Sequence, residues 1–219
     1  METRLQLDKQ LGDLYQLILK MGALVEEALN KSIEALKNDD EALAKSVIEG
    51  DDLIDAIHMQ VEDQSTQIIA LEQPVATDLR ELITATKIGA DLERIGDHAR
   101  HIARVVKSLP TDLVSASLPN IEKMAGIGIS MVHDALTAYV DQDAEKARSV
   151  ALRDDEIDDA HKRLYQDLVA IMRNRPEWIE YGVKLMFLNR YLERLGDHVT
   201  NICEWVIFAK TGDHVELNK

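Results

Sequence analysis

The chain repeats itself, and this internal repeat limits the folds that it can adopt. Residues 92–98 read LERIGDH and recur 100 positions later as LERLGDH. A second block, which begins at Asp51, recurs from Asp154, and Pro74 and Pro176 are separated by a similar interval. Matching segments in the same order indicate that one structural unit of about 100 residues is present twice.

Each unit has the sequence pattern of three long helices. Apolar residues recur every three or four positions between residues 7 and 33, which is typical of one buried helix face. Residues 38–40, Asn-Asp-Asp, interrupt this pattern and offer an N-cap to a second helix. Pro74 ends that second helix, because proline cannot continue a helix interior. The second unit shows the same order of helices and breaks, with Pro176 in the corresponding place.

The segment between the two units contains two prolines and small polar residues, a composition that predicts a linker. We therefore predict an all-α protein made of two tandem, pseudo-symmetric three-helix bundles with six long helices. The first bundle is expected at residues 1–109, the linker at residues 110–119 and the second bundle at residues 120–219.

The composition excludes several classes of function. The chain has 25 basic against 40 acidic residues, a net charge of −15. Such a charge argues against a nucleic-acid binder, which presents a basic face to phosphates, and against electrostatic docking on an anionic membrane. No apolar run approaches the roughly 20 residues that span a bilayer, and Cys203, the single cysteine, cannot form an internal disulfide. We expect a cytoplasmic protein without nucleic-acid binding or direct membrane insertion.

Carboxylates recur at helical spacing in both units. Glu93 and Asp97 are four residues apart and share one helix face, and His101 extends this stripe by another turn. On the preceding helix, Asp51, Asp55 and His58 also share a face. The second unit repeats the pattern, with Asn201 in the place of His101. Its candidate residues are Asp154, Asp158, His161, Glu193 and Asp197.

Repeated pairs of like charge call for a compensating cation, since each pair destabilises an isolated helix by about 0.2–0.5 kcal/mol. If the second and third helices of a unit pack side by side, they offer four carboxylates and a histidine to one site. Oxygen and imidazole donors suit Fe, Zn, Mn or Mg. We predict one metal site in each bundle, holding one ion or several, with Fe or Zn ahead of Mn or Mg. The alternative is a solvated acidic face paired with Arg94 and Arg194.

The motifs resemble those of the PhoU family, the phosphate-specific transport system accessory proteins. The similar stretches are residues 73–80, 91–98 and 192–198, with the Asp-x-x-Ile-Asp pattern at 51–55 and again at 154–158. The resemblance implies two three-helix bundles whose (E/D)xxxD motifs bind metal clusters, with iron in some members. It also implies a homodimeric negative regulator of phosphate-starvation signalling. Its implied partners are the ATPase subunit of the phosphate transporter and a membrane sensor histidine kinase, which would recruit it to the inner face of the membrane.

The chain departs from the family pattern at several positions. His58 and His161 stand where many members have glutamate, which could change the preferred metal. His101 has Asn201 as its repeat partner, so the two sites need not be equivalent. His98 and His198 lie off the acidic stripe, and we expect them to support the structure rather than bind metal.

Three functions fit the sequence. The first is a regulatory adaptor without catalysis, because no nucleophile triad, Walker loop or dinucleotide motif is present. The second is a carboxylate-bridged metalloenzyme or ferroxidase-like iron protein, since the spacing from Asp55 to His58 and from Asp158 to His161 imitates the Glu-x-x-His motif of di-iron proteins. The third is a helical scaffold without metal.

Overall fold

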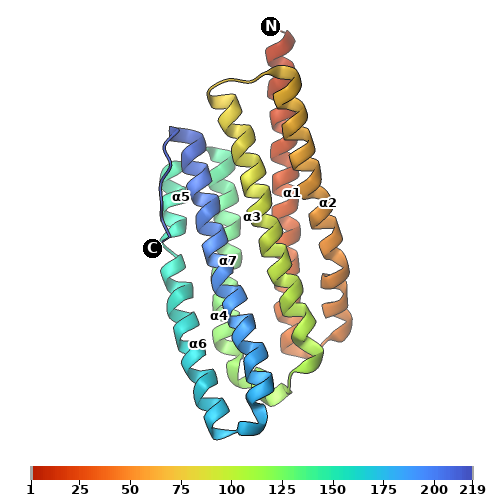
Figure 1. Ribbon diagram of the computed structural model, residues 1–219, viewed down its shortest axis with the longest axis vertical. Helices are drawn as coiled ribbons and strands as arrows, with labels where there is room; N and C mark the ends of the chain where they lie inside the picture. The colour runs from red at the N-terminus through yellow and green to blue at the C-terminus, as the bar shows by residue number, and fades with distance from the viewer. Residues whose placement is uncertain (1, 219) are drawn as a thin grey trace.

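The computed structural model describes residues 2–218, and these residues form helices joined by short connections, without a β-strand. The first bundle consists of α1 (Glu2–Asn38), α2 (Glu41–Glu72) and α3 (Thr77–Val105). The second consists of α4 (Thr111–Asp141), α5 (Ala144–Ala151), α6 (Asp154–Asn174) and α7 (Ile179–Thr211). Short 3₁₀ helices, η1 (Val106–Ser108) and η2 (Pro176–Trp178), precede α4 and α7. The two bundles lie side by side (Figure 1), and the predicted all-α class is confirmed.

The helix ends follow the predicted signals. Asp40 caps α2, its carboxylate accepting a hydrogen bond from the Leu43 amide at 2.9 Å. Asp143 caps α5 in the same way, at the corresponding turn of the second unit. The helix α2 ends at Glu72, and the next residue, Gln73, has a left-handed backbone immediately before Pro74. These local interactions satisfy amide groups that a helix end otherwise leaves without partners.

The segment 110–119, predicted to be a linker, is instead largely helical. The helix α4 begins at Thr111 and passes through Pro119. Leu113 of this segment and Ile121 just after it lie on one helix face and are fully buried. Burial of that face outweighs the hydrogen bond that Pro119 removes, so the chain stays helical where its composition suggests a loop.

The second helix of the second unit is interrupted, whereas α2 is continuous. Leu152 and Arg153 form a turn between α5 and α6, which together occupy the position of α2. As a result Asp154 is the first residue of α6, while its repeat partner Asp51 lies within α2. The unpaired amides of a helix N-terminus favour a carboxylate, so this break changes the surroundings of Asp154.

The two bundles pack against each other through α3 and α7, with α1 packing on α4. The helices α3 and α7 run antiparallel (Figure 1). Near one end, Thr84 Oγ1 donates a hydrogen bond to the Trp205 carbonyl at 3.4 Å, and further along His98 stacks on Tyr191. This register relates the two units by an approximate twofold axis. The core is aliphatic, and none of the described helices combines the length and apolarity needed to cross a bilayer.

The proline within α4 gives a first prediction. Pro119 is exposed and lacks the amide hydrogen that would reach the carbonyl one turn earlier. Pro119→Ala restores that bond, and we expect the free energy of unfolding to rise by about 1–3 kcal/mol in urea titrations. Pro110→Ala is the control, since Pro110 lies at the start of α4 and its loss only frees the unfolded chain, lowering stability by about 0.4–1 kcal/mol. A destabilised Pro119→Ala would show that the proline supports the helix.

Candidate metal centres

The helices α2 and α3 bring the predicted acids of the first unit together. Asp51 is only 3% exposed, and burial raises the pKa of its carboxyl to about 6 against the opposing charge of Arg100. The neighbouring carboxylates of Asp55, Asp97 and Glu93 add to this rise. Burial also raises the pKa of Glu93. We call this set, with His58, the first acidic cluster; its members are Asp51, Asp55, His58, Glu93 and Asp97.

An arginine that the sequence did not single out lies in the first acidic cluster. Arg100 Nη1 lies 2.7 Å from Asp51 Oδ2, and Arg100 Nη2 pairs with Asp97. The guanidinium therefore bridges α2 and α3. Arg94 lies 3.5 Å from Glu93 Oε2, as the alternative of salt bridging anticipated. The i, i+3 spacing of Asp97 and Arg100 was the available signal, but spacing does not show that Arg100 also reaches another helix.

The second acidic cluster has the same acids without that arginine. It comprises Asp154, Asp158, His161, Glu193 and Asp197. Burial raises the pKa of Asp154 to about 7, with the carboxylates of Asp197, Asp158 and Glu193 contributing. No described residue forms an ion pair with Asp154, because Thr200 stands in the position that Arg100 has in the first unit.

Two glycines allow the close helix approach that creates these clusters. A Cβ atom at Gly96 would lie 3.0 Å from Ile54 Cδ1 and 3.6 Å from Asp51 Oδ1. A Cβ atom at Gly196 would overlap the Asp154 carboxylate. The missing side chains therefore make room for the acids of the preceding helix.

The predicted histidines have different surroundings. His58 packs beside Gly89, and its Nε2 lies 3.6 Å from Glu62 Oε1. His161 is held by Asn189, which donates from Nδ2 to the His161 carbonyl at 3.1 Å. The charges of His58 and His161 lower the pKa of Glu93 and Glu193, respectively, so each is close to its cluster, although burial dominates both shifts and raises them.

His101 lies instead against the second bundle. Its ring stacks on Tyr191 of α7 with centroids 5.0 Å apart. The helix stripe of Glu93 and Asp97 is thus followed by a side chain that turns towards the interface between bundles.

The donors of both clusters fit a hard cation, although they are not arranged as ligands in the described structure. Among residues 5–218, no three His, Cys, Asp or Glu side chains converge on one possible ion position. In the second cluster, buried Asp154 Oδ1 and Glu193 Oε2 have no hydrogen-bond partner. Buried carboxylate oxygens without partners are unfavourable, and a divalent ion would satisfy them after small side-chain rotations.

The two Asp-x-x-His segments do not face each other. The helices α2 and α6, which carry them, lie on opposite outer sides of the molecule (Figure 1). A di-iron enzyme of the helical type places both motifs in one four-helix bundle. Each cluster of this protein is instead built from two helices of its own bundle.

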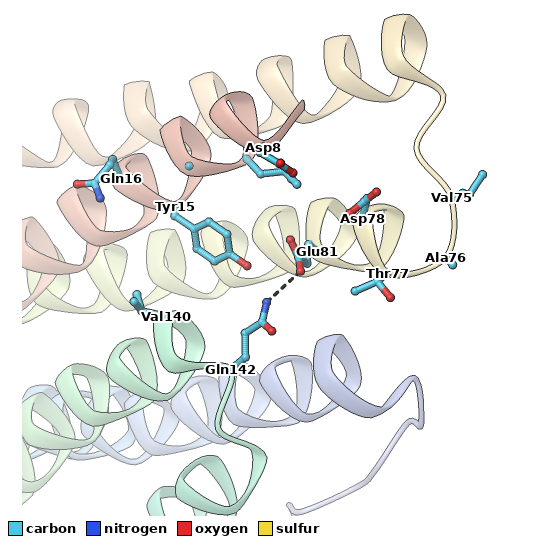
Figure 2. A pocket seen from close by; sticks show the side chains of 12 residues that line it. Asp8, Tyr15, Gln16, Val75, Ala76, Thr77, Asp78, Glu81, Val140 and Gln142 are labelled. Atoms are coloured by element: carbon cyan, nitrogen blue, oxygen red, sulfur yellow. Dashed lines mark hydrogen bonds between the residues drawn. The ribbon is translucent and has the colours of Figure 1, made fainter. Parts of the chain in front are cut away.

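An open pocket of about 710 Å³, shown in Figure 2, is lined by residues outside both clusters. It is bordered by the start of α1, the connection before α3 and the end of α4. Asp8, Asp78 and Glu81 line it, and Gln142 Nε2 donates to Glu81 Oε1 at 2.9 Å. An anion such as phosphate would meet three carboxylates there, so the pocket does not suit it.

Cys203 is a core residue, as its helical pattern suggested. It is fully buried, and burial raises the pKa of its thiol to about 12, with Glu204 adding to the shift. A thiol with this pKa is protonated at neutral pH and is not a nucleophile.

These features define a class of protein. It is a helical protein of two repeats with one acidic cluster in each bundle, between α2 and α3 in the first and between α6 and α7 in the second. The sequence profile of the PhoU domain matches this chain twice, at residues 18–106 and 121–206. The chain is also 38% identical to a phosphate-specific transport system accessory protein PhoU homolog of Clostridium acetobutylicum, over 99% of both chains. The chain belongs to the PhoU family.

Solved structures agree with this assignment. The crystal structure of PhoU from Pseudomonas aeruginosa superposes with a TM-score of 0.87 at 34% identity, covering 94% of this chain and 99% of that one. The phosphate transport system regulatory protein PhoU from Streptococcus pneumoniae superposes with a TM-score of 0.89 at 31% identity, covering 96% and 99%. The PhoU family predicted from the motifs is thus confirmed.

The second acidic cluster predicts how stability depends on pH in metal-free protein. Because the folded-state pKa of Asp154 is about 7, above the ordinary value of 3.8, the folded state binds more protons than the unfolded state between these values. Stability therefore falls as the pH rises towards 7. Asp154→Asn removes this loss of stability, because asparagine has no carboxyl group to ionise. We expect the difference in Tm between the variant and the wild type to be about 2–4 °C larger at pH 8 than at pH 5, which corresponds to about 1 kcal/mol in the free energy of unfolding.

Thermal unfolding in the presence of a chelator measures this difference. Asp159→Asn is the matched control, because Asp159 lies on the same helix with a side chain that is 70% exposed. An equal gain for Asp154→Asn at both pH values would contradict a raised Asp154 pKa.

Proposed function

We propose that this protein is a metal-binding regulatory adaptor that controls phosphate uptake and represses the phosphate-starvation response. The observation that carries the proposal is the pair of acidic clusters at equivalent places in the two bundles of a PhoU-family chain. The name of the Clostridium acetobutylicum relative, an accessory protein of the phosphate-specific transport system, supports the phosphate role.

In the proposed metal-bound state, each cluster holds Fe or Zn. The same donors would bind Mn or Mg more weakly. The carboxylates supply hard oxygen ligands, and His58 or His161 supplies a nitrogen. Arg100 would have to leave Asp51 before an ion could enter the first acidic cluster. In the second acidic cluster, exposed Arg190 pairs with Glu193, but no described arginine pairs with Asp154, so we expect this cluster to bind the ion more tightly.

The adaptor acts through protein contacts and not by catalysis. The partners proposed from the family are the ATPase subunit of the phosphate transporter and a membrane sensor histidine kinase. The protein would work as a homodimer in the cytoplasm and reach the membrane through these partners. Metal in the clusters would stiffen the contact between the second and third helices, because the ions replace repulsion between carboxylates by attraction.

Metal analysis of protein purified without an affinity tag tests the clusters. We expect metal in the wild type and a loss of at least half of it in Glu193→Gln, whose cluster has no arginine paired with Asp154. Glu93→Gln/Glu193→Gln should lose the metal of both clusters and keep at most about one ion per chain. The control Asp63→Asn/Asp159→Asn removes two exposed acids outside the clusters and should keep the wild-type content. Equal metal in the wild type and the Glu93/Glu193 variant would contradict the proposal. Rapid Fe(II) oxidation that the variant loses would favour a ferroxidase instead.

Deletion of the gene in the source organism tests the regulatory role. We expect phosphate-scavenging genes to be expressed in high phosphate, because the repressing adaptor is absent. The wild-type protein should restore repression, whereas Glu93→Gln/Glu193→Gln should restore it only weakly if metal is required. Transcript levels of the scavenging genes measure the effect. Unchanged repression in the deletion strain would argue against this role.

A further inference from the structure

A pair of histidines lies between the two bundles, away from both acidic clusters. His98 of α3 and His198 of α7 belong to the repeated motif and face each other across the approximate twofold axis. Their ring centroids are 5.5 Å apart, with an interplanar angle of 45°. His98 is only 6% exposed. The packing of α3 on α7 thus encloses two imidazoles at a position outside both acidic clusters.

The hydrogen bonds of this pair leave nitrogen lone pairs unused. His198 Nδ1 lies 2.9 Å from Asp91 Oδ1, and Asn201 Nδ2 donates to the same oxygen at 3.3 Å. The carboxylate therefore holds the proton on Nδ1 and leaves Nε2 as a free acceptor. His198 Nε2 and both nitrogens of His98 are buried without a hydrogen-bond partner. An imidazole oriented by a carboxylate, with its other nitrogen free, is the usual arrangement of a histidine metal ligand.

The spacing of the rings agrees with a shared ion. An imidazole nitrogen lies about 1.1 Å from its ring centroid and a Zn–N bond is about 2.0–2.1 Å long, so two imidazoles on one tetrahedral ion have centroids about 5.2 Å apart. The separation of 5.5 Å between His98 and His198 is close to this value. Small rotations of the rings would therefore suffice to bind one ion.

Two arginines, Arg94 and Arg194, lie near the pair. Arg94 is paired with Glu93 and Asp97, and Arg194 is exposed. Tyr191 stacks on His98 and closes one side of the pair.

We propose that His98 and His198 form a third metal site, which takes a borderline transition-metal ion such as Zn²⁺, Ni²⁺ or Cu²⁺ and joins the two bundles. Asp91 is the positioning residue, and water completes the coordination. Imidazole nitrogen suits these ions, whereas the carboxylate clusters also suit harder ones such as Mg²⁺. The site differs in both ligands and place from the acidic clusters, since Asp97 faces α2 while His98 beside it faces α7.

Zn²⁺ titration by calorimetry tests the site in the full chain. The background is Glu93→Gln/Glu193→Gln, which removes a ligand from each acidic cluster. We expect about one Zn²⁺ to bind to this background. His198→Gln should abolish that binding, and Asp91→Asn should weaken it about 10–100-fold, as loss of a carboxylate behind a histidine ligand does. His133→Gln, which changes an exposed histidine on α4, should leave it unchanged.

Cu²⁺ electron paramagnetic resonance identifies the ligands. One equivalent of Cu²⁺ should show splitting from two nitrogens in the same background. The splitting should be lost in His98→Gln/His198→Gln and kept in His58→Gln/His161→Gln. Circular dichroism confirms folding, and if the His98 variant unfolds, His198→Gln alone decides the result. A background that binds no Zn²⁺, or binding that survives His198→Gln, would overturn the proposal.

Discussion

The close contact of α2 with α3 in the first bundle, and of α6 with α7 in the second, governs the rest of the structure. Ile54 and Ile157 are buried at this contact, and Gly96 and Gly196 remove the side chains that would hold the helices apart. This apolar contact buries the carboxylates of Asp51 and Asp154 and places them next to other carboxylates. Burying like charges is costly unless a proton, an arginine or a metal ion compensates. The two clusters follow from this single constraint.

The repeat produces two centres that are similar but not equivalent. The first acidic cluster contains Arg100, which already neutralises part of its charge, and its second helix is continuous. In the second cluster, Thr200 replaces the arginine and Asp154 begins a helix after a break. Arg190 pairs with Glu193 in this cluster, but compensation at Asp154 depends on protons or an added ion. A duplicated protein can in this way hold one site whose buried aspartate is paired with an arginine and another whose equivalent aspartate is not.

The helices α3 and α7 connect the clusters to the contact between bundles. Neighbouring residues of a helix point about 100° apart, so an acid can face its own bundle while the next side chain faces the other. Asp97 and His98 show this division: the first pairs with Arg100, and the second faces His198. A change of charge in a cluster that shifts α3 would therefore also displace His98, because both sets of residues lie on the same rigid helix.

The sequence by itself determined the duplicated unit, the all-helical class, the family and the acids that meet, because apolar periodicity and i, i+4 spacing are local properties of a helix. Only the tertiary structure decided the outcome at other positions. Pro119 stays within α4 because burial of a helix face outweighs one lost hydrogen bond, and composition does not report burial. Arg100 reaches Asp51, and His101 turns to Tyr191, because of contacts between helices far apart in sequence. Spacing along one helix shows which side chains share a face, whereas packing decides what that face meets.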